Sequence, residues 1–194
     1  MGSGELEEED PRPLRVRAFF GLPVPDPQRG QLSHFISECA DIAPEFRWTP
    51  AENLHLTIRF IGGVSRTVVE GIADALAARR LEAFDVELGD VGTFGRGRAA
   101  RVVWLGLRVG AEKATLMAAR VEEECLRAGL PSDERAFTAH LTLARARPRG
   151  GARLPELPPA PRLQQWRADR LLLYSSQLAR SGALYEQLRS VGLK

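Results

Sequence analysis

The 194-residue chain is poor in cysteine, histidine and lysine, and each shortage narrows what the protein can be. Its two cysteines, Cys39 and Cys125, are far apart and follow no spacing typical of a metal site or a redox pair. Both fall on the apolar sides of predicted helices, so we expect small buried hydrophobic residues in a reducing compartment. No apolar run approaches membrane-spanning length and no signal peptide is visible, so we expect a cytoplasmic protein without a membrane partner.

Positive charge comes almost wholly from arginine, because Lys113 and Lys194 are the only lysines among 27 basic residues. The net charge of +2 includes an acidic start, MGSGELEEED, and the rest of the chain is more basic. We therefore predict a flexible acidic tail over residues 1–13 and a single bilobal domain over 14–194. The flat arginine guanidinium pairs two donors with one phosphate or carboxylate, so the composition permits an anionic partner without establishing one.

Apolar periodicity predicts a series of strands and helices after the tail. The predicted strands cover 14–22, 53–61, 84–88, 101–108, 137–144 and 168–175. The predicted helices cover 31–42, 67–80 and 112–128, and a short closing element covers 183–191. The glycine-rich stretch GTFGRGR (92–98) is predicted to be a turn, and the proline-rich stretch LPELPPAPR (154–162) a surface loop.

Two of the three histidines open the same tripeptide, His-Leu-Thr, at 55–57 and 140–142. Each tripeptide lies in the last strand of a strand–helix–strand series, and an internal duplication of a β-α-β unit explains this order. If the two halves pack about an approximate two-fold axis, the two tripeptide strands become neighbours. His55 and His140 then come together despite their separation in sequence.

Strand alternation places His55, Thr57 and Arg59 on one face and only apolar residues on the other. The second tripeptide repeats this arrangement with His140 and Thr142. A single histidine on a strand is more often a surface residue than a catalyst, and threonine suits strands for its β-branch alone. Core packing explains repeated leucines, but it gives no reason to repeat the histidines. The repetition therefore favours a shared site.

Two imidazoles that flank one site can divide acid–base work, because histidine titrates near pH 6.5. One accepts a proton while the other donates one, and the threonine hydroxyls donate hydrogen bonds to oxygens that gain charge. A phosphate diester suits this layout. A zinc site is less well supported, because two histidines are too few ligands and no Cys, Asp or Glu shares their face. The chain has no Gly-x-Ser-x-Gly, P-loop or dinucleotide glycine motif. The third histidine, His34, lacks this context and is predicted to be exposed.

The chain resembles the two-histidine (2H) phosphoesterase superfamily, and within it the RNA 2′,3′-cyclic phosphodiesterase family, known as LigT or ThpR and formerly as 2′-5′ RNA ligase. The resemblance is carried by RVRAFFGLPVP (15–25), RWTPAENLHLTIRFIGGV (47–64), RVVWLGL (101–107), RAGLPSDERAFTAHLTLAR (127–145) and LLLYSSQLARSGALYEQL (171–188). The pair Ser175–Ser176 departs from relatives, which often have Glu there.

This resemblance implies an α+β fold with antiparallel sheets lining a central cleft and helices outside. It implies that His55 is the general acid on the leaving 3′ oxygen and that His140 is the general base on water. Thr57 and Thr142 then hold the non-bridging phosphate oxygens, and the product is a 2′-phosphomonoester. The expected substrates are RNA with a 2′,3′-cyclic phosphate end or small cyclic nucleotides. No metal and no cofactor are expected, and we expect a monomer.

Four further residues are candidates for substrate binding: Arg145, Arg59, Phe19 and Trp48. Relatives often carry an arginine at the position of Arg145, but its parity in a regular strand is opposite to that of His140. It reaches a phosphate only if the strand ends or bulges there. Arg59 has the correct parity, and an aromatic ring such as Phe19 or Trp48 can stack on a base or simply pack in the core. The segment RARPRGGAR (145–153) is either a solvated loop or a contact for the RNA backbone.

Three other activities stay open at the level of sequence. The same acid and base can run the reverse reaction and join RNA ends through a 2′-5′ linkage. The chain can also be an RNA- or nucleotide-binding module with little turnover. A related activity on small molecules such as ADP-ribose 1″,2″-cyclic phosphate is the third.

Overall fold

The computed structural model describes residues 14–179 and 182–194, so the predicted acidic tail lies outside the described residues. The helical elements are α1 (Asp26–Ile42), the 3-10 turn η1 (Ala51–Asn53), α2 (Arg66–Ala78) and α3 (Ala111–Arg127). The strands are β1 (Arg15–Pro23), β2 (Phe46–Trp48), β3 (His55–Ser65), β4 (Phe84–Arg96), β5 (Ala99–Val109), β6 (His140–Ala146), β7 (Ala152–Arg153), β8 (Trp166–Ala168), β9 (Arg170–Ala179) and β10 (Gly182–Gly192).

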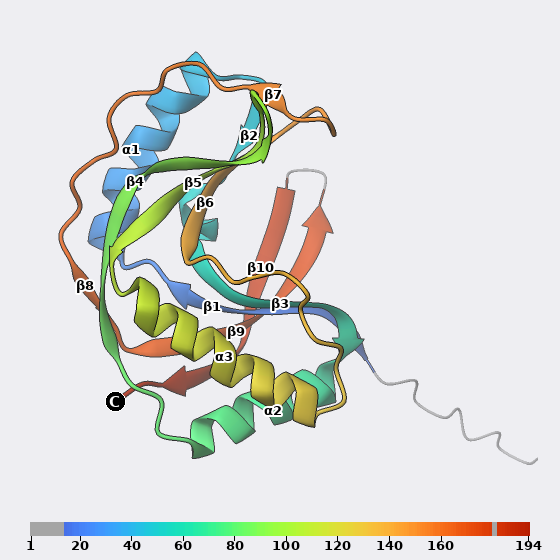
Figure 1. The fold of residues 1–194 in the computed structure, drawn as a ribbon. Coiled ribbons are helices and arrows are strands. Elements are labelled where there is room, and N and C mark those ends of the chain that lie inside the picture. The colour runs from blue at the N-terminus through green and yellow to red at the C-terminus, as the bar shows by residue number, and fades with distance from the viewer. Residues whose placement is uncertain (1–13, 180–181) are drawn as a thin grey trace, which may run out of the picture.

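Antiparallel pairing joins the strands in the order β10-β9-β1-β3-β6-β5-β4-β8, with β2 and β7 added beside β6 and β5. Strands β3 and β6 stand at the middle, with three strands of this order beyond each of them (Figure 1). The predicted α+β class is confirmed. The two predicted sheets are two halves of one sheet, because β3 and β6 pair directly. The cleft between the halves stays a prediction.

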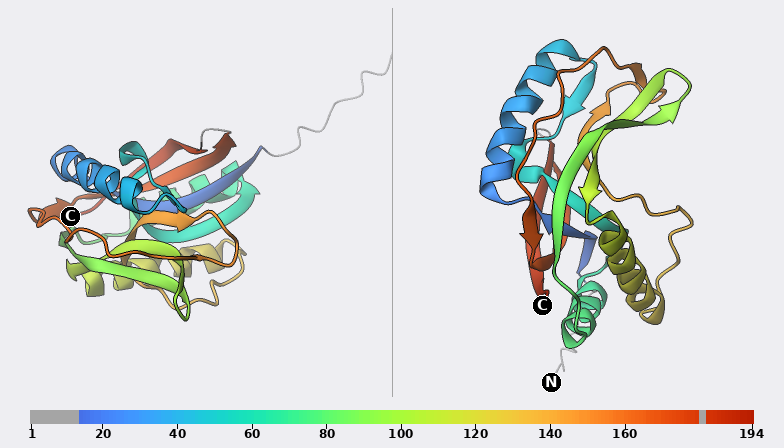
Figure 2. Two further views of the ribbon diagram at one scale, coloured as in Figure 1. Left: turned by 90° about the horizontal axis from the view of Figure 1, so that it is seen from above. Right: turned by 60° about the vertical axis from the view of Figure 1, so that its left-hand side comes forward.

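The duplicated unit is present as β1-α1-β3 and β5-α3-β6. In each copy the two strands are antiparallel neighbours, which agrees with the repeated order read from the sequence. Helices α2 and α3 pack against each other and against β3, while α1 packs against β2 and η1. Figure 2 shows α1 at one end of the molecule and the α2–α3 pair at the other. No described helix is both long enough and apolar enough to cross a bilayer.

The helices bury the apolar stripes that their spacing predicts. The buried residues include Leu32, Phe35, Ile36 and Cys39 on α1, Val69, Ile72, Ala73 and Leu76 on α2, and Ala114, Met117, Val121 and Cys125 on α3. Both cysteines are free and fully buried, and burial raises the pKa of each thiol to about 11. They are therefore inert core residues, as predicted.

Three predicted boundaries are wrong for physical reasons. Helix α1 begins at Asp26 rather than at residue 31, because a proline in the first turn loses no helical hydrogen bond. Strand β4 continues through most of the stretch predicted as a turn, and only Gly97, with φ of 57°, takes the left-handed conformation there. The short closing element is the long strand β10.

Candidate active site

The two His-Leu-Thr tripeptides lie side by side at the centre of the sheet. Strands β3 and β6 are antiparallel and pair through the middle residues of the tripeptides, Leu56 and Leu141, which are both buried. Residues flanking an antiparallel pair meet in reverse order, so each histidine faces the threonine of the other tripeptide. The histidines are then diagonal neighbours, with Cβ atoms about 7 Å apart. The face of the two strands that lies opposite to the buried leucines carries His55, Thr57, His140 and Thr142. We call it the histidine face.

The two imidazoles are held in the same way. The Nδ1 of His55 lies 2.7 Å from the carbonyl oxygen of Asn53, and the Nδ1 of His140 lies 2.7 Å from that of Thr138. A carbonyl oxygen only accepts hydrogen bonds, so Nδ1 is the donor in each ring. In the neutral form this leaves a lone pair on Nε2, and in the charged form a proton. Each ring therefore presents Nε2 as its reactive atom.

Burial lowers the pKa of both histidines. The pKa of His55 falls to about 4, chiefly because its imidazolium would lose hydration. The positive charges of Arg145 and His140 lower it further, whereas the bond to Asn53 acts in the opposite direction. The pKa of His140 is also lowered, again by burial first and then by Arg145. Both rings are therefore neutral at pH 7 in the free protein.

The chain matches the family model "LigT like Phosphoesterase" over residues 22–104 and 107–185, and each matched segment contains one of the two tripeptides.

The chain belongs to the LigT-like phosphoesterases.

Relatives and solved structures agree with this family. The RNA 2′,3′-cyclic phosphodiesterase of Aeropyrum pernix is 33% identical over 84% of this chain and 94% of that protein. The protein of the same name from Escherichia coli is 29% identical over 89% of this chain and 94% of its own length. The crystal structure of E. coli LigT complexed with 3′-AMP has a TM-score of 0.80 at 27% identity, covering 93% of this chain and 99% of that one. E. coli LigT has also been solved with phosphate, NADP+ and ATP.

In this LigT-like phosphoesterase, three aromatic rings surround His55. Phe19 lies with its ring centre 4.6 Å from that of His55, Tyr185 at 5.3 Å and Tyr174 at 6.0 Å. Phe19 is only 3% exposed, so it packs beneath the imidazole and has no free face for a base. The rings explain why burial dominates the pKa of His55. Sequence reasoning missed both tyrosines, because β9 and β10 approach the site only in the folded chain.

A second aromatic pair lies beside His140. The rings of Phe94 and Trp104 lie 5.0 and 6.0 Å from that of His140. The indole of Trp104 covers Gly92 on the neighbouring strand so closely that any Cβ there would overlap it. Phe94 is 36% exposed, which makes it the more accessible ring of this pair. The glycine-rich stretch therefore lines the site and does not form only a turn.

A β-bulge turns Arg145 toward the histidine face. Two consecutive residues of β5 pair with Ala144 and Thr142, so Leu143 is an extra residue of β6. The alternation shifts by one position, and Leu143 and Ala144 are both buried. Arg145 therefore returns to the face of Thr142, and its charge lowers the pKa of both histidines. The bulge that a phosphate role of Arg145 requires is therefore present.

The guanidinium of Arg59 is bound by other groups of the protein. Its guanidinium donates to Glu122 at 2.5 Å and to Asp133 at 3.3 Å, and it also binds the carbonyl oxygens of Phe60 and Pro131. Only 12% of its side chain is exposed. These bonds tie β3 to α3 and to the loop that leads into the second tripeptide. A bulge at Ile58 also turns Arg59 to the face of buried Phe20, its cross-strand partner, so its predicted place on the face of His55 is wrong. Arg59 braces the fold from the helix side of the sheet.

We expect Arg59→Ala to destabilise the fold by about 2–3 kcal/mol, because it leaves Glu122 half-buried without its cation. Its kcat/KM per folded molecule should stay within about threefold of wild type. Thermal unfolding and cyclic nucleotide hydrolysis measure the two effects. The control is Arg120→Ala, which removes an exposed ion pair with Glu123 and should leave the melting temperature nearly unchanged. A large rise in KM without loss of stability would restore a substrate role for Arg59.

Trp48 also lies in a structural setting. Its Nε1 donates to the carbonyl oxygen of Ala43 at 3.1 Å, and its ring lies near that of Phe46, which is buried. Alternation on β2 turns Trp48 with Phe46 toward the core, away from the histidine face. A stacking role for Trp48 stays a prediction without a contact that supports it.

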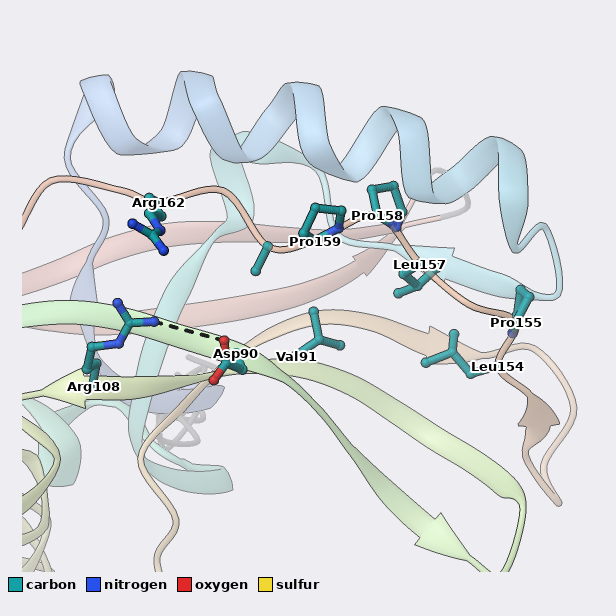
Figure 3. A pocket seen from close by; sticks show the side chains of 10 residues that line it. Asp90, Val91, Arg108, Leu154, Pro155, Leu157, Pro158, Pro159 and Arg162 are labelled. Carbon is teal, nitrogen blue, oxygen red and sulfur yellow. Dashed lines mark ion pairs between the residues drawn. The ribbon is translucent and has the colours of Figure 1, made fainter.

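A cavity of about 470 Å³ lies on the other side of the sheet from the histidines. It opens to solvent between β4 and the proline-rich segment 154–162, and Figure 3 shows Arg162, Pro159 and Leu157 along this segment with Val91 facing them. Val91 pairs with Leu105, which is buried on the face opposite to Trp104. The cavity is therefore separate from the candidate active site. Residues 14–179 and 182–194 also contain no cluster of three or more His, Cys, Asp or Glu suited to a metal ion.

Proposed function

We propose that the chain hydrolyses 2′,3′-cyclic phosphate ends of RNA to 2′-phosphomonoesters without a metal. The observation that carries the proposal is the diagonal arrangement of two Nδ1-anchored imidazoles and two threonine hydroxyls on one face. Such a set matches a tetrahedral phosphate: one nitrogen on the attacking side, one on the leaving side, and a hydroxyl for each non-bridging oxygen. The relatives' names give the same substrate class.

In the proposed step, Nε2 of His140 takes a proton from water as the water oxygen bonds to phosphorus. The bond between phosphorus and the 3′ oxygen breaks, and Nε2 of His55 gives its proton to that oxygen. The hydroxyls of Thr57 and Thr142 donate to the non-bridging oxygens, where charge develops. Arg145 supports the anion from the same face. The product has a 2′-phosphomonoester and a free 3′ hydroxyl. His140 then releases its proton to solvent and His55 regains one.

The acid role of His55 requires its charged form, although its pKa in the free protein is about 4. A bound phosphate anion raises the pKa of both rings, because it stabilises an imidazolium nearby. The low pKa of His55 in the free protein, taken alone, favours the neutral form that a base needs. The assignment of His55 as the acid comes from the family resemblance.

The direct test is incubation of the protein with a 2′,3′-cyclic nucleotide in the presence of EDTA, followed by assignment of the phosphate position in the product. We expect a 2′-phosphate and a rate that EDTA does not change. A 3′-phosphate product would show that the 2′ oxygen leaves instead of the 3′ oxygen. A rate abolished by EDTA would reject metal-free chemistry. Adding an RNA with a 5′-hydroxyl end reveals any joining activity in the same assay.

We predict an acidic optimum for kcat/KM. The reactive form carries one neutral and one charged imidazole, and the fraction of protein with one proton on the pair is highest between its two pKa values. One value is about 4 and the other lies below the ordinary value of 6.5, because both pKa values are lowered. As pH rises above that window the charged ring is lost, and kcat/KM should fall about tenfold per pH unit.

The optimum of kcat should lie at higher pH than that of kcat/KM, because the bound anion raises both pKa values. Initial rates from pH 4 to 9, at substrate concentrations below and above KM, measure both profiles. A kcat/KM that stays level from pH 6 to 9 would contradict this protonation scheme.

A further inference from the structure

Arginines gather at one end of the sheet without acidic partners. Elsewhere, arginines such as Arg59, Arg79 and Arg127 form ion pairs with Glu or Asp. Where the tips of β4 to β7 and the short strand β2 meet, the exposed arginines form no ion pair within the described residues; they include Arg47, Arg96, Arg98, Arg145, Arg149 and Arg153. This end of the sheet therefore carries positive charge that the described chain does not neutralise by ion pairing.

Four side chains form a row across this end of the sheet. The strand registers pair Phe94 with Val102, Val102 with Arg145, and Arg145 with Arg47. Residues directly opposite each other share a face, so the row lies on the histidine face with Arg145. Adjacent strands are about 4.8 Å apart, which places the two guanidinium groups within reach of one anion. Both arginines are exposed.

Two like charges in directly opposite positions destabilise a sheet unless an anion lies between them. Arg47 and Arg145 hold these positions, and neither has an ion pair or hydrogen bond from its guanidinium within the described residues. Glu45, the acid just before β2, forms no ion pair with them there. The geometry of the pair thus suits an external phosphate, which accepts hydrogen bonds from two arginines at once.

The row lies next to the reactive residues. The preceding pair on the same face is Trp104 with Thr142, and the buried pair Val103–Ala144 and the bulged Leu143 separate it from the level of Arg145. Arg145 is close enough to lower the pKa of both histidines. A phosphate bound between the histidines therefore has its next neighbour along an RNA strand at the level of this row.

We propose that Arg47, together with Arg145, binds the phosphodiester that precedes the terminal nucleotide. The RNA strand leaves the histidines over the row, with the exposed ring of Phe94 at its β4 end available to a base. The substrate is then a single-stranded oligoribonucleotide with a cyclic phosphate end, preferred over a cyclic mononucleotide. This inference rests on the proposed function.

The test compares a cyclic mononucleotide with an oligoribonucleotide that ends in a 2′,3′-cyclic phosphate. In Arg47→Gln the ratio of kcat/KM for the oligonucleotide to that for the mononucleotide should fall roughly tenfold, the loss of one charge-assisted hydrogen bond. Loss of one phosphate contact should also make the logarithmic salt dependence for the oligonucleotide shallower by about 0.7. Arg47→Lys should recover part of both. The matched control is Arg162→Gln, which removes an exposed arginine beside the cavity on the other face and should change neither quantity.

The inference is overturned if wild type shows no preference for the oligonucleotide, or if Arg47→Gln leaves the ratio and the salt slope unchanged. If wild type hydrolyses neither substrate, the proposed function fails instead. Fluorescence anisotropy then measures binding of an oligonucleotide that ends in a 2′-phosphate, which tests the proposed RNA path over Arg47 and Arg145 without catalysis. Weaker binding by Arg47→Gln than by Arg162→Gln supports the path, and equal binding rejects it.

Discussion

Replacing His55 or His140 by alanine should lower kcat for a 2′,3′-cyclic nucleotide by about 10²–10⁴-fold in each case. Each variant removes one of the two proton transfers. The tyrosines beside His55 stay protonated near neutral pH, because burial raises the pKa of both. The double variant should lose little more than either single variant, because both groups act in one step. Single-turnover rates with a cyclic mononucleotide measure the loss without interference from product release.

The control is His34→Ala. His34 lies exposed on α1, 3.5 Å from Glu38, and belongs to no tripeptide. Its replacement should leave kcat and the melting temperature unchanged. Melting curves of the His55 and His140 variants should show folded proteins. Full activity in either folded variant would end the acid–base pair as a mechanism.

A substrate with sulfur in place of the 3′ bridging oxygen separates acid from base. A thiolate leaves without protonation, because its conjugate thiol is far more acidic than an alcohol. If His55 is the acid, His55→Ala should regain most of its lost rate on this substrate, whereas His140→Ala should not. The opposite pattern assigns the roles in reverse, with His55 acting in the neutral form that its low pKa favours in the free protein.

Replacing Thr57 or Thr142 by valine should lower kcat by about 10²-fold or more. Valine keeps nearly the same shape on the strand but removes the hydroxyl that donates to a non-bridging oxygen. The effect should appear in kcat more than in KM, because the oxygens gain charge only in the transition state. Steady-state kinetics with the cyclic mononucleotide measure both parameters.

Serine at either position should restore activity to within about tenfold of wild type, because the hydroxyl returns. Thr115→Val serves as the control. Thr115 is an exposed residue of α3 whose hydroxyl donates to the carbonyl oxygen of Ala111, far along the chain from both tripeptides. Valine variants of Thr57 and Thr142 with wild-type kcat would remove the threonines from the reaction.

The sequence predicted the helices better than the strand ends. Helical spacing is a local signal, and the buried stripes of all three helices match it. Strand β4 was predicted too short because its second half is rich in glycine. In the folded chain the indole of Trp104 lies over Gly92 and supplies the contacts that a side chain at that position would otherwise make.

In the candidate site, too, some features follow from local sequence and others only from the folded chain. Alternation along each tripeptide was enough to place each histidine on the same face as its threonine, away from the buried leucines. The position of Arg145 depended on a bulge at Leu143, which pairing with β5 reveals and the sequence of β6 does not. Arg59 has the parity of the site only in a regular strand, and a bulge at Ile58 turns it to the face of buried Phe20. There Glu122 and Asp133 bind it. Their approach depends on how α3 and the following loop pack.

The sequence by itself determined the duplicated unit, the two pairs of histidine and threonine, and the family, because these are properties of local spacing and composition. The tertiary structure alone decided that Leu56 pairs with Leu141, that aromatic rings from β1, β9 and β10 enclose His55, and that Arg47 lies opposite Arg145. Those contacts join residues that are distant in sequence. Their register is set by long-range pairing and burial, which no local pattern encodes.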